Sequence, residues 1–96
     1  MISLNSTVVA VQDQVSADLG GEVAILQLGS GVYYGLDEVG ARIWSLIQEP
    51  RRVSQVRDIL LAEYEVEGDR CQRDVLALFE HLLAHELIQI KDETTP

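Results

Sequence analysis

Basic residues are scarce in this 96-residue chain, and their scarcity disfavours one large class of function. Lys and Arg together number 7 against 16 Asp and Glu, so the formal net charge is −9. A surface that binds nucleic acid needs a basic stripe that displaces counterions from the phosphates. The composition therefore disfavours nucleic acid as a partner, and a neutral or cationic peptide is electrostatically easier to bind.

Cysteine and long hydrophobic runs are also nearly absent. Cys71 is the only cysteine, so the chain has neither an internal disulfide nor a cysteine-rich zinc site. The N-terminus lacks a basic region, and its apolar run Val8–Val11 is too short for a signal peptide. No run approaches the roughly 18 apolar residues that a membrane span requires. We therefore expect a soluble, cytoplasmic protein.

The residue types that carry catalysis do not form a recognisable set. His81 and His85 are spaced like two metal ligands on one helix, but a zinc site needs a third and a fourth ligand, so we expect two exposed helix histidines instead. Cys71 falls on an apolar stripe, where cysteine usually acts as a small hydrophobe. The glycines at 29–31 precede a strand rather than a helix, so they form no phosphate cradle. We predict no enzyme activity, no metal and no cofactor.

Short glycine turns divide the first half of the chain into strands. Residues 14–19 alternate between polar and apolar side chains, which predicts a half-buried strand. A glycine pair suited to a hairpin turn leads to residues 22–28, which are apolar on both faces, as in a central strand. A second glycine turn leads to Val32–Leu36, which we place at one edge of an antiparallel meander. The apolar positions expected to be buried in the first strand are Val15, Ala17 and Leu19.

Three amphipathic helices are expected after the strands. The first begins after Asp37, whose carboxylate suits a helix N-cap, and ends before Pro50. After an exposed link at Arg51–Arg52, the second helix covers about residues 53–64 and the third about 68–85. The faces expected to be buried at helical spacing contain Val39, Ile43, Trp44 and Ile47 in the first helix, and Cys71, Val75, Leu78, Phe79, Leu82 and Leu83 in the third.

These elements predict one α+β domain, similar to a winged helix-turn-helix, with a small antiparallel three-stranded sheet followed by three helices. We assign residues 14–90 to this domain and residues 1–13 to an N-terminal arm or an extra strand. Residues 87–90 form a short extended tail that returns to the core. Residues 91–96 are expected to fray.

The two adjacent tyrosines of the third strand are candidates for a binding site. Neighbouring strand residues point to opposite faces, so one ring joins the core while the other faces out or lines a groove. An exposed sheet edge beside a helix is a receptor for an extended peptide. Two interpretations remain open for Tyr33 and Tyr34: packing alone, or a wall for a side chain of a bound peptide.

Two runs of the chain resemble the PqqD-like family of precursor-peptide recognition elements, over roughly residues 14–90. They are EVAILQLGSGVYYGLDEVGARIW and LLAEYEVEGDRCQRDVLALFEHLLAHELIQI. The matching marks are Gly31, Tyr33-Tyr34, Leu36, Val39-Gly40, Ile43-Trp44, Tyr64, Asp74-Val75 and Leu87-Ile88.

The resemblance implies a winged helix-turn-helix that binds no DNA. Such a domain binds the leader of a ribosomally made precursor by β-strand addition, and it delivers the precursor to a protease, cyclase or other modifying enzyme. The chain is most similar to the stand-alone leader-binding proteins of lasso-peptide biosynthesis. By position, the implied peptide-binding residues are Val32, Tyr33, Tyr34, Gly35, Leu36, Cys71, Asp74, Val75 and Leu78.

The chain departs from the family pattern in places. Asp37 stands where members often carry Asn, which conserves a helix cap. Glu86 stands where members often carry Gly, and Glu tolerates a left-handed C-cap poorly. Two other functions compete with leader binding: a structural subunit of a peptide-modifying enzyme complex, and a winged-helix DNA-binding regulator, which the acidic balance disfavours.

Overall fold

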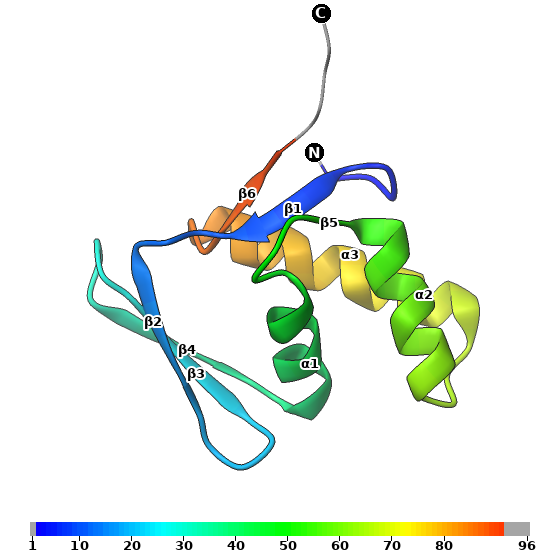
Figure 1. The fold of residues 1–96 in the computed structure, drawn as a ribbon, viewed down its shortest axis with the longest axis horizontal. Helices are drawn as coiled ribbons and strands as arrows, with labels where there is room; N and C mark the ends of the chain where they lie inside the picture. Colours follow the sequence, from blue (N-terminus) through cyan, green and yellow to red (C-terminus); the bar gives the residue numbers. More distant parts are fainter. Residues whose placement is uncertain (1, 92–96) are drawn as a thin grey trace, which may run out of the picture.

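Two small antiparallel sheets and three helices make up residues 2–91, the part of the chain that the computed structural model describes (Figure 1). The sheet predicted from the glycine turns is present, and three helices follow it in the chain. Residues 92–96 of the expected frayed tail lie outside the described range. The elements are β1 (Thr7–Ala10), β2 (Gln14–Asp18), β3 (Val23–Gln27), β4 (Val32–Leu36), α1 (Glu38–Leu46), β5 (Arg51–Arg52), α2 (Val53–Glu63), α3 (Gly68–Ala84) and β6 (Ile88–Ile90).

The larger sheet is the predicted meander, with strand order β2-β3-β4 and β4 at one edge. Its first hairpin turns through Gly20 (φ 77°) and Gly21 (φ 101°), which occupy the positive-φ region that glycine adopts without strain. The Asp18 carboxylate accepts hydrogen bonds from both glycine N–H groups, at 3.1 and 3.3 Å. Turn chemistry local in the sequence therefore fixes this hairpin.

A second sheet, with order β5-β1-β6, joins the two ends of the described chain. The N-terminal segment that we left as an arm or a strand contains β1, and the extended tail contains β6. Arg51–Arg52 was predicted to be only an exposed link, and this was wrong. It pairs with Thr7–Val8 of β1, because a link between two helices still has backbone groups that a neighbouring strand can bond.

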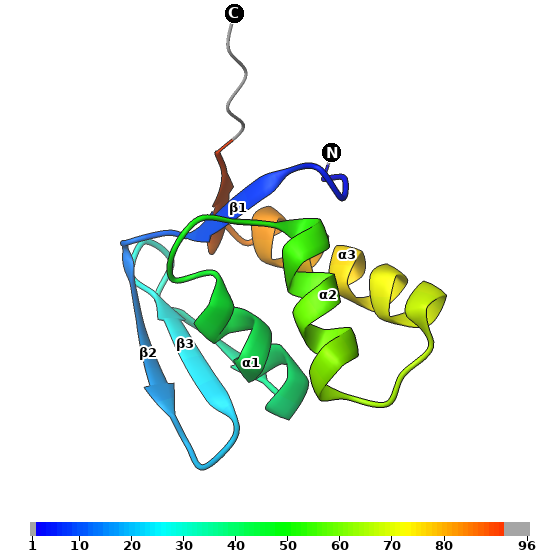
Figure 2. The same cartoon turned by 45° about the vertical axis from the view of Figure 1, so that its right-hand side comes forward.

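Helix α1 packs against one face of the meander, α2 and α3 lie on the far side of α1, and the core lies among these elements (Figure 2). Four members of the predicted stripe of α3, Cys71, Val75, Phe79 and Leu82, are buried. The other two, Leu78 and Leu83, are half-buried and pack against the core. They pack with buried residues of α1, α2 and the strands, which include Ile25, Ile43, Trp44, Ile47, Val53, Val56, Leu60 and Leu87.

Part of the predicted burial was wrong. Val15 and Leu19 are 56% and 63% exposed, because their face of the meander points away from the helices. Ala17, which lies between them on that face, is exposed too. Leu28 lies beyond the end of β3 and is 55% exposed, and Val39 of α1 is 41% exposed. A period of two or of 3.6 residues shows that a face is apolar, but not whether another element covers it.

Candidate binding site

The outer edge of β4 presents unpaired backbone groups, and the register of the sheet shows which ones. The β2–β3 hairpin closes with a 2.7 Å bond from Leu19 N–H to the Glu22 carbonyl. Because bonding directions alternate along an antiparallel strand, the backbone groups of Ile25 point away from β2, toward its partner in β4. The two neighbours of that partner, Tyr33 and Gly35, therefore direct their N–H and C=O groups outward. No strand within residues 2–91 pairs with this edge.

The side chains of β4 divide between the two faces of the sheet, as expected for the tyrosine pair. Tyr34 and Leu36 face the helices, are half-buried and pack against the core. Tyr33 points to the opposite face and is 71% exposed. Tyr34 is therefore the inward ring and Tyr33 the outward one.

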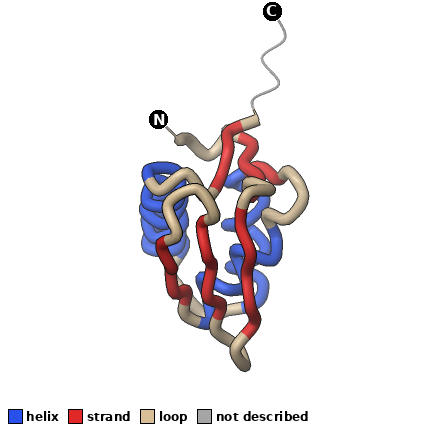
Figure 3. The backbone as a smooth tube through the Cα atoms, turned by 90° about the vertical axis from the view of Figure 1, so that its left-hand side faces the viewer, coloured by secondary structure: helices blue, strands red, loops and turns tan. Residues whose placement is uncertain are grey.

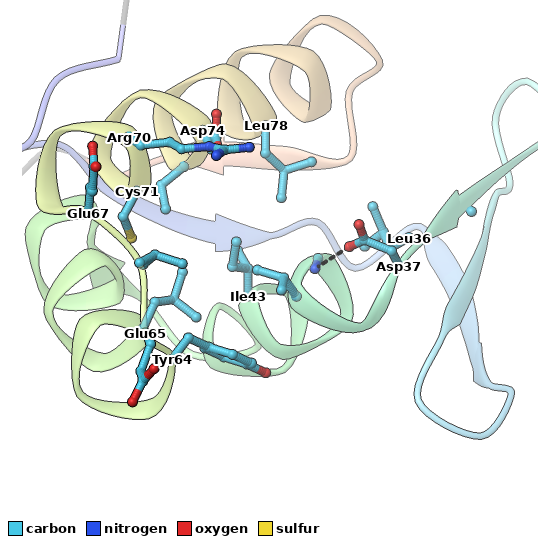
Figure 4. A pocket seen from close by; sticks show the side chains of 16 residues that line it. Leu36, Asp37, Ile43, Tyr64, Glu65, Glu67, Arg70, Cys71, Asp74 and Leu78 are labelled. Atoms are coloured by element: carbon cyan, nitrogen blue, oxygen red, sulfur yellow. Dashed lines mark hydrogen bonds and ion pairs between the residues drawn. The ribbon is translucent and has the colours of Figure 1, made fainter.

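A pocket of about 960 Å³ lies at the end of β4, between α1, the end of α2 and the first half of α3 (Figure 4). This volume falls within the range of ligand-binding clefts. Its walls come from segments far apart in the sequence, which the fold brings together around an apolar centre. The lining residues are Gly35, Leu36, Asp37, Val39, Gly40, Ile43, Leu60, Tyr64, Glu65, Val66, Glu67, Arg70, Cys71, Asp74, Val75 and Leu78.

Six of the nine predicted site residues line this pocket, and three do not. Val32, Tyr33 and Tyr34 belong to the strand but lie away from the pocket, whereas Gly35 and Leu36 line it. The α3 candidates all reach it; two of them, Cys71 and Val75, are also core residues with 6% and 2% exposure. The six that line the pocket are Gly35, Leu36, Cys71, Asp74, Val75 and Leu78.

The sequence analysis missed the walls that α1 and α2 contribute. Val39 and Gly40 come from the first turn of α1, and the α2–α3 connection adds Tyr64 and Val66. Val39 and Val66 are large apolar residues with 41% and 47% exposure, and such exposure is the mark of a binding surface. It is invisible in the sequence, where Val39 simply falls on an apolar helical face.

The pocket rim is mostly acidic. The lining contains four exposed carboxylates and one cationic side chain, that of Arg70 (Figure 4). The carboxylates belong to Asp37, Glu65, Glu67 and Asp74. The contact between Arg70 and Asp74 is 3.8 Å long and 74% exposed on both sides, so it adds little stability.

Burial raises the pKa of the Cys71 thiol above its ordinary value; the Asp74 carboxylate adds to the rise, and Arg57 opposes it. A thiol held protonated is a poor nucleophile.

One of the two histidines is less exposed than we expected from the sequence. We expected both to be exposed on the third helix, and only His81 is exposed. His85 is half-buried, because its Nδ1 lies 3.1 Å from the Tyr34 hydroxyl. Within residues 2–91 no group of three or more His, Cys, Asp or Glu side chains is arranged to hold a metal ion. Over the same residues, no helix has the length and hydrophobicity to span a membrane.

An open sheet edge that ends in an apolar pocket between helices defines a class of small α+β domain suited to holding an extended segment. Over residues 22–88 the chain matches the family of coenzyme PQQ synthesis protein D (PqqD), and it belongs to that family. The resemblance of its two sequence runs to PqqD-like proteins is thereby confirmed.

Two solved structures extend the comparison. The chain is similar to TbiB1 in complex with the TbiA(beta) leader peptide, with 36% identity, a TM-score of 0.78, and coverage of 92% of this chain and 98% of that one. It shares its fold with a lasso peptide synthetase B1 complexed with the leader peptide, at 24% identity and a TM-score of 0.76, covering 85% and 96% of the two chains. No curated protein sequence matches the chain.

Proposed function

We propose that this protein is a non-catalytic adaptor that binds the leader of a ribosomally synthesised precursor, of the lasso-peptide class, by β-strand addition. The observation that carries the proposal is the outer edge of β4, open among the described residues and leading into the apolar pocket. Main-chain bonds along such an edge supply affinity, while pockets for alternate side chains supply specificity. TbiB1, which is 36% identical, was solved with a leader peptide bound, and this supports the same ligand class here.

In this proposal the leader strand bonds the backbone of Tyr33 and Gly35 and lies along Val32–Leu36, beside α3. One of its inward side chains enters the pocket beside Leu36 and contacts α3. The pocket centre is apolar and its rim is acidic, so a large apolar side chain with a cationic neighbour would suit it. The α3 residues assigned to this contact are Cys71, Asp74, Val75 and Leu78.

The adaptor would deliver the bound precursor to a processing protease or cyclase in the cytoplasm. Delivery requires a second surface, and the outer face of the β2–β3–β4 sheet is suited to it. Val15, Leu19 and Tyr33 are exposed on that face, and the helices lie behind it (Figure 3). A leader added at the β4 edge would extend this same sheet, so the enzyme would meet the leader and the adaptor on one continuous face.

The test is fluorescence anisotropy with a labelled leader peptide taken from the precursor encoded beside the gene. The wild-type protein should bind saturably, and a scrambled leader should not. Tyr33→Pro removes an N–H from the outer edge of β4, and we expect it to weaken binding about tenfold or more.

The matched control is Ser16→Pro, on the opposite edge of the same sheet. Ser16 pairs with Ile25, so by the same alternation its N–H points away from β3. This variant should keep the wild-type affinity. If both proline variants bound the leader as wild type does, strand addition at β4 would be wrong. If the folded wild-type protein bound no leader, the structural-subunit function would replace this one.

A further inference from the structure

Three aromatic side chains form a polar cluster beyond the pocket, where the C-terminal half of α3 faces β4. The Tyr34 hydroxyl lies 3.1 Å from His85 Nδ1, and the two ring centroids are 4.8 Å apart. The His81 ring meets the His85 ring edge to face, with centroids 4.5 Å apart. Tyr34 comes from the strand and both histidines come from the helix, so the cluster bridges the two elements that flank the proposed leader strand.

The geometry of strand addition places this cluster under the leader. If Tyr33 and Gly35 bond the leader, the leader residues opposite Tyr34 and Leu36 point inward, on the same face as those two side chains. The residue opposite Leu36 meets the pocket, which Leu36 lines. The residue opposite Tyr34 is two positions away, about 7 Å along the strand, and it meets the histidines.

The cluster has hydrogen-bond donors to offer to such a residue. We assign the Tyr34 hydroxyl as the donor to His85 Nδ1, which places the ring proton on Nε2 and leaves that nitrogen as a hydrogen-bond donor. Among residues 2–91 neither histidine forms an ion pair with a carboxylate, although the chain contains 16 acidic residues. A ligand that accepts hydrogen bonds would therefore find these donors available.

We propose that Tyr34, His81 and His85 form a second subsite of the leader groove, which takes a carboxylate side chain two residues from the one that enters the pocket. The inference rests on the proposed leader binding and specifies the ligand further. The acidic pocket rim and this imidazole cluster then distinguish the two inward positions of the leader, which fixes its register along β4.

The test is a scan of the labelled leader peptide, in which each position in turn is replaced by Leu and the affinity is measured by anisotropy. The scan is repeated with His85→Asn and with His81→Asn. Asn at position 85 keeps a polar atom near the place of Nδ1, beside the Tyr34 hydroxyl, but removes the Nε2 donor. The pocket variant Leu78→Ala locates the leader position that enters the pocket.

We expect replacement of one Asp or Glu of the leader to weaken binding to the wild-type protein about tenfold, as loss of a charge-assisted bond should. The same replacement should have almost no further effect on the affinity of the His85→Asn variant. This acidic leader position should lie two residues from the leader position whose replacement is coupled to Leu78→Ala. A role that only maintains the fold would lower binding of every peptide equally.

Equal sensitivity of all peptides to His85→Asn, or coupling to no acidic position, would overturn the second subsite while leaving leader binding intact. Absence of saturable binding to the wild-type protein would overturn the proposed function itself, and the two failures are therefore distinguishable.

Discussion

At the scale of single residues, Glu86 adopts a conformation that its side chain disfavours. It ends α3 with φ 59°, in the left-handed region. Its N–H donates to the Leu83 carbonyl at 3.0 Å, and Leu87 N–H donates to the Leu82 carbonyl at 2.9 Å, the pattern of a Schellman motif. A Cβ in this region costs energy that glycine avoids, and we expect Glu86→Gly to raise the free energy of unfolding by about 1 kcal/mol.

Urea denaturation followed by circular dichroism measures this change. Glu86→Ala is the control, because it removes the carboxylate but keeps a Cβ at the left-handed position. It should recover only the part of the gain that comes from removing a negative charge at a helix C-terminus. Equal stabilisation by Ala and Gly would show that charge, not backbone strain, sets the effect.

Cys71 provides a second prediction at this scale. The pKa of its thiol is raised, chiefly by burial, so the reactive thiolate is scarce at neutral pH. We expect its reaction with a disulfide reagent near pH 7 to be at least about tenfold slower than in urea-unfolded protein, and to accelerate as the pH rises. Ellman's reagent, which releases a coloured thiolate, measures both rates. Equal rates in the folded and unfolded protein would contradict the burial of this side chain.

Helix boundaries could be predicted where the capping group is local in the sequence. The carboxylate of Asp37 accepts from Gly40 N–H at 2.8 Å, and both residues lie within one turn. The start of α2 could not be explained in this way. Its first N–H groups, from Val53 and Ser54, donate to backbone carbonyls of the N-terminal segment at 2.9 and 3.0 Å. The local cap is the Gln55 side chain, which accepts from Arg52 N–H at 3.1 Å, whereas the acceptors for Val53 and Ser54 lie almost fifty positions away in the sequence.

At the scale of elements, one ion pair joins α1 to the end of α2 and makes stability depend on pH. Arg42 donates from Nε and Nη2 to the two Glu63 carboxylate oxygens, at 2.9 and 2.7 Å. This hydrogen bonding lowers the pKa of the Glu63 carboxyl below its ordinary value and raises that of Arg42. Because the folded pKa is depressed, the pair stabilises the fold at neutral pH, and its contribution is lost as the pH falls through the lowered value.

Glu63→Gln tests this linkage. We expect the difference in unfolding free energy between this variant and wild type to be small, since the pair is exposed, and to shrink as the pH falls from about 7 to about 3. Urea titrations at several pH values measure it. Glu49→Gln removes an exposed carboxylate that forms no ion pair within residues 2–91, and it reports the general effect of one negative charge. A difference that stays constant with pH would contradict the assignment.

The candidate site was predictable only in part, for a reason that operates at the scale of the whole molecule. The strand Val32–Leu36 and the stripe of α3 were recognisable because each is a continuous segment with its own period. The pocket between them also needs Val39 and the α2–α3 connection, and only the packing of three helices brings these together. A pocket assembled from distant segments leaves no periodic signal in any one of them.

Exposed large hydrophobic side chains gather on two surfaces of the described molecule. Two of them, Val39 and Val66, line the pocket. Three others, Val15, Leu19 and Tyr33, lie on the outer face of the β2–β3–β4 sheet, which no other described element covers (Figure 3). An exposed apolar patch of this kind marks an interaction site. The other two, Leu28 and Val32, flank the β3–β4 turn, and Val32 lies on the same face as Tyr34 and Leu36.

Substitutions on β2 can separate the two surfaces, because β2 lies across the sheet from the leader edge. We expect the double variant Val15→Ser/Leu19→Ser to bind the leader with wild-type affinity while lowering the rate of precursor cleavage by the cognate protease at least about tenfold. Anisotropy measures the first quantity, and mass spectrometry of the cleaved leader measures the second. Ala77→Ser, on the exposed side of α3, should change neither. If the double variant supported cleavage at the wild-type rate, the protease would have to contact another face, and the apolar sheet would need a different partner.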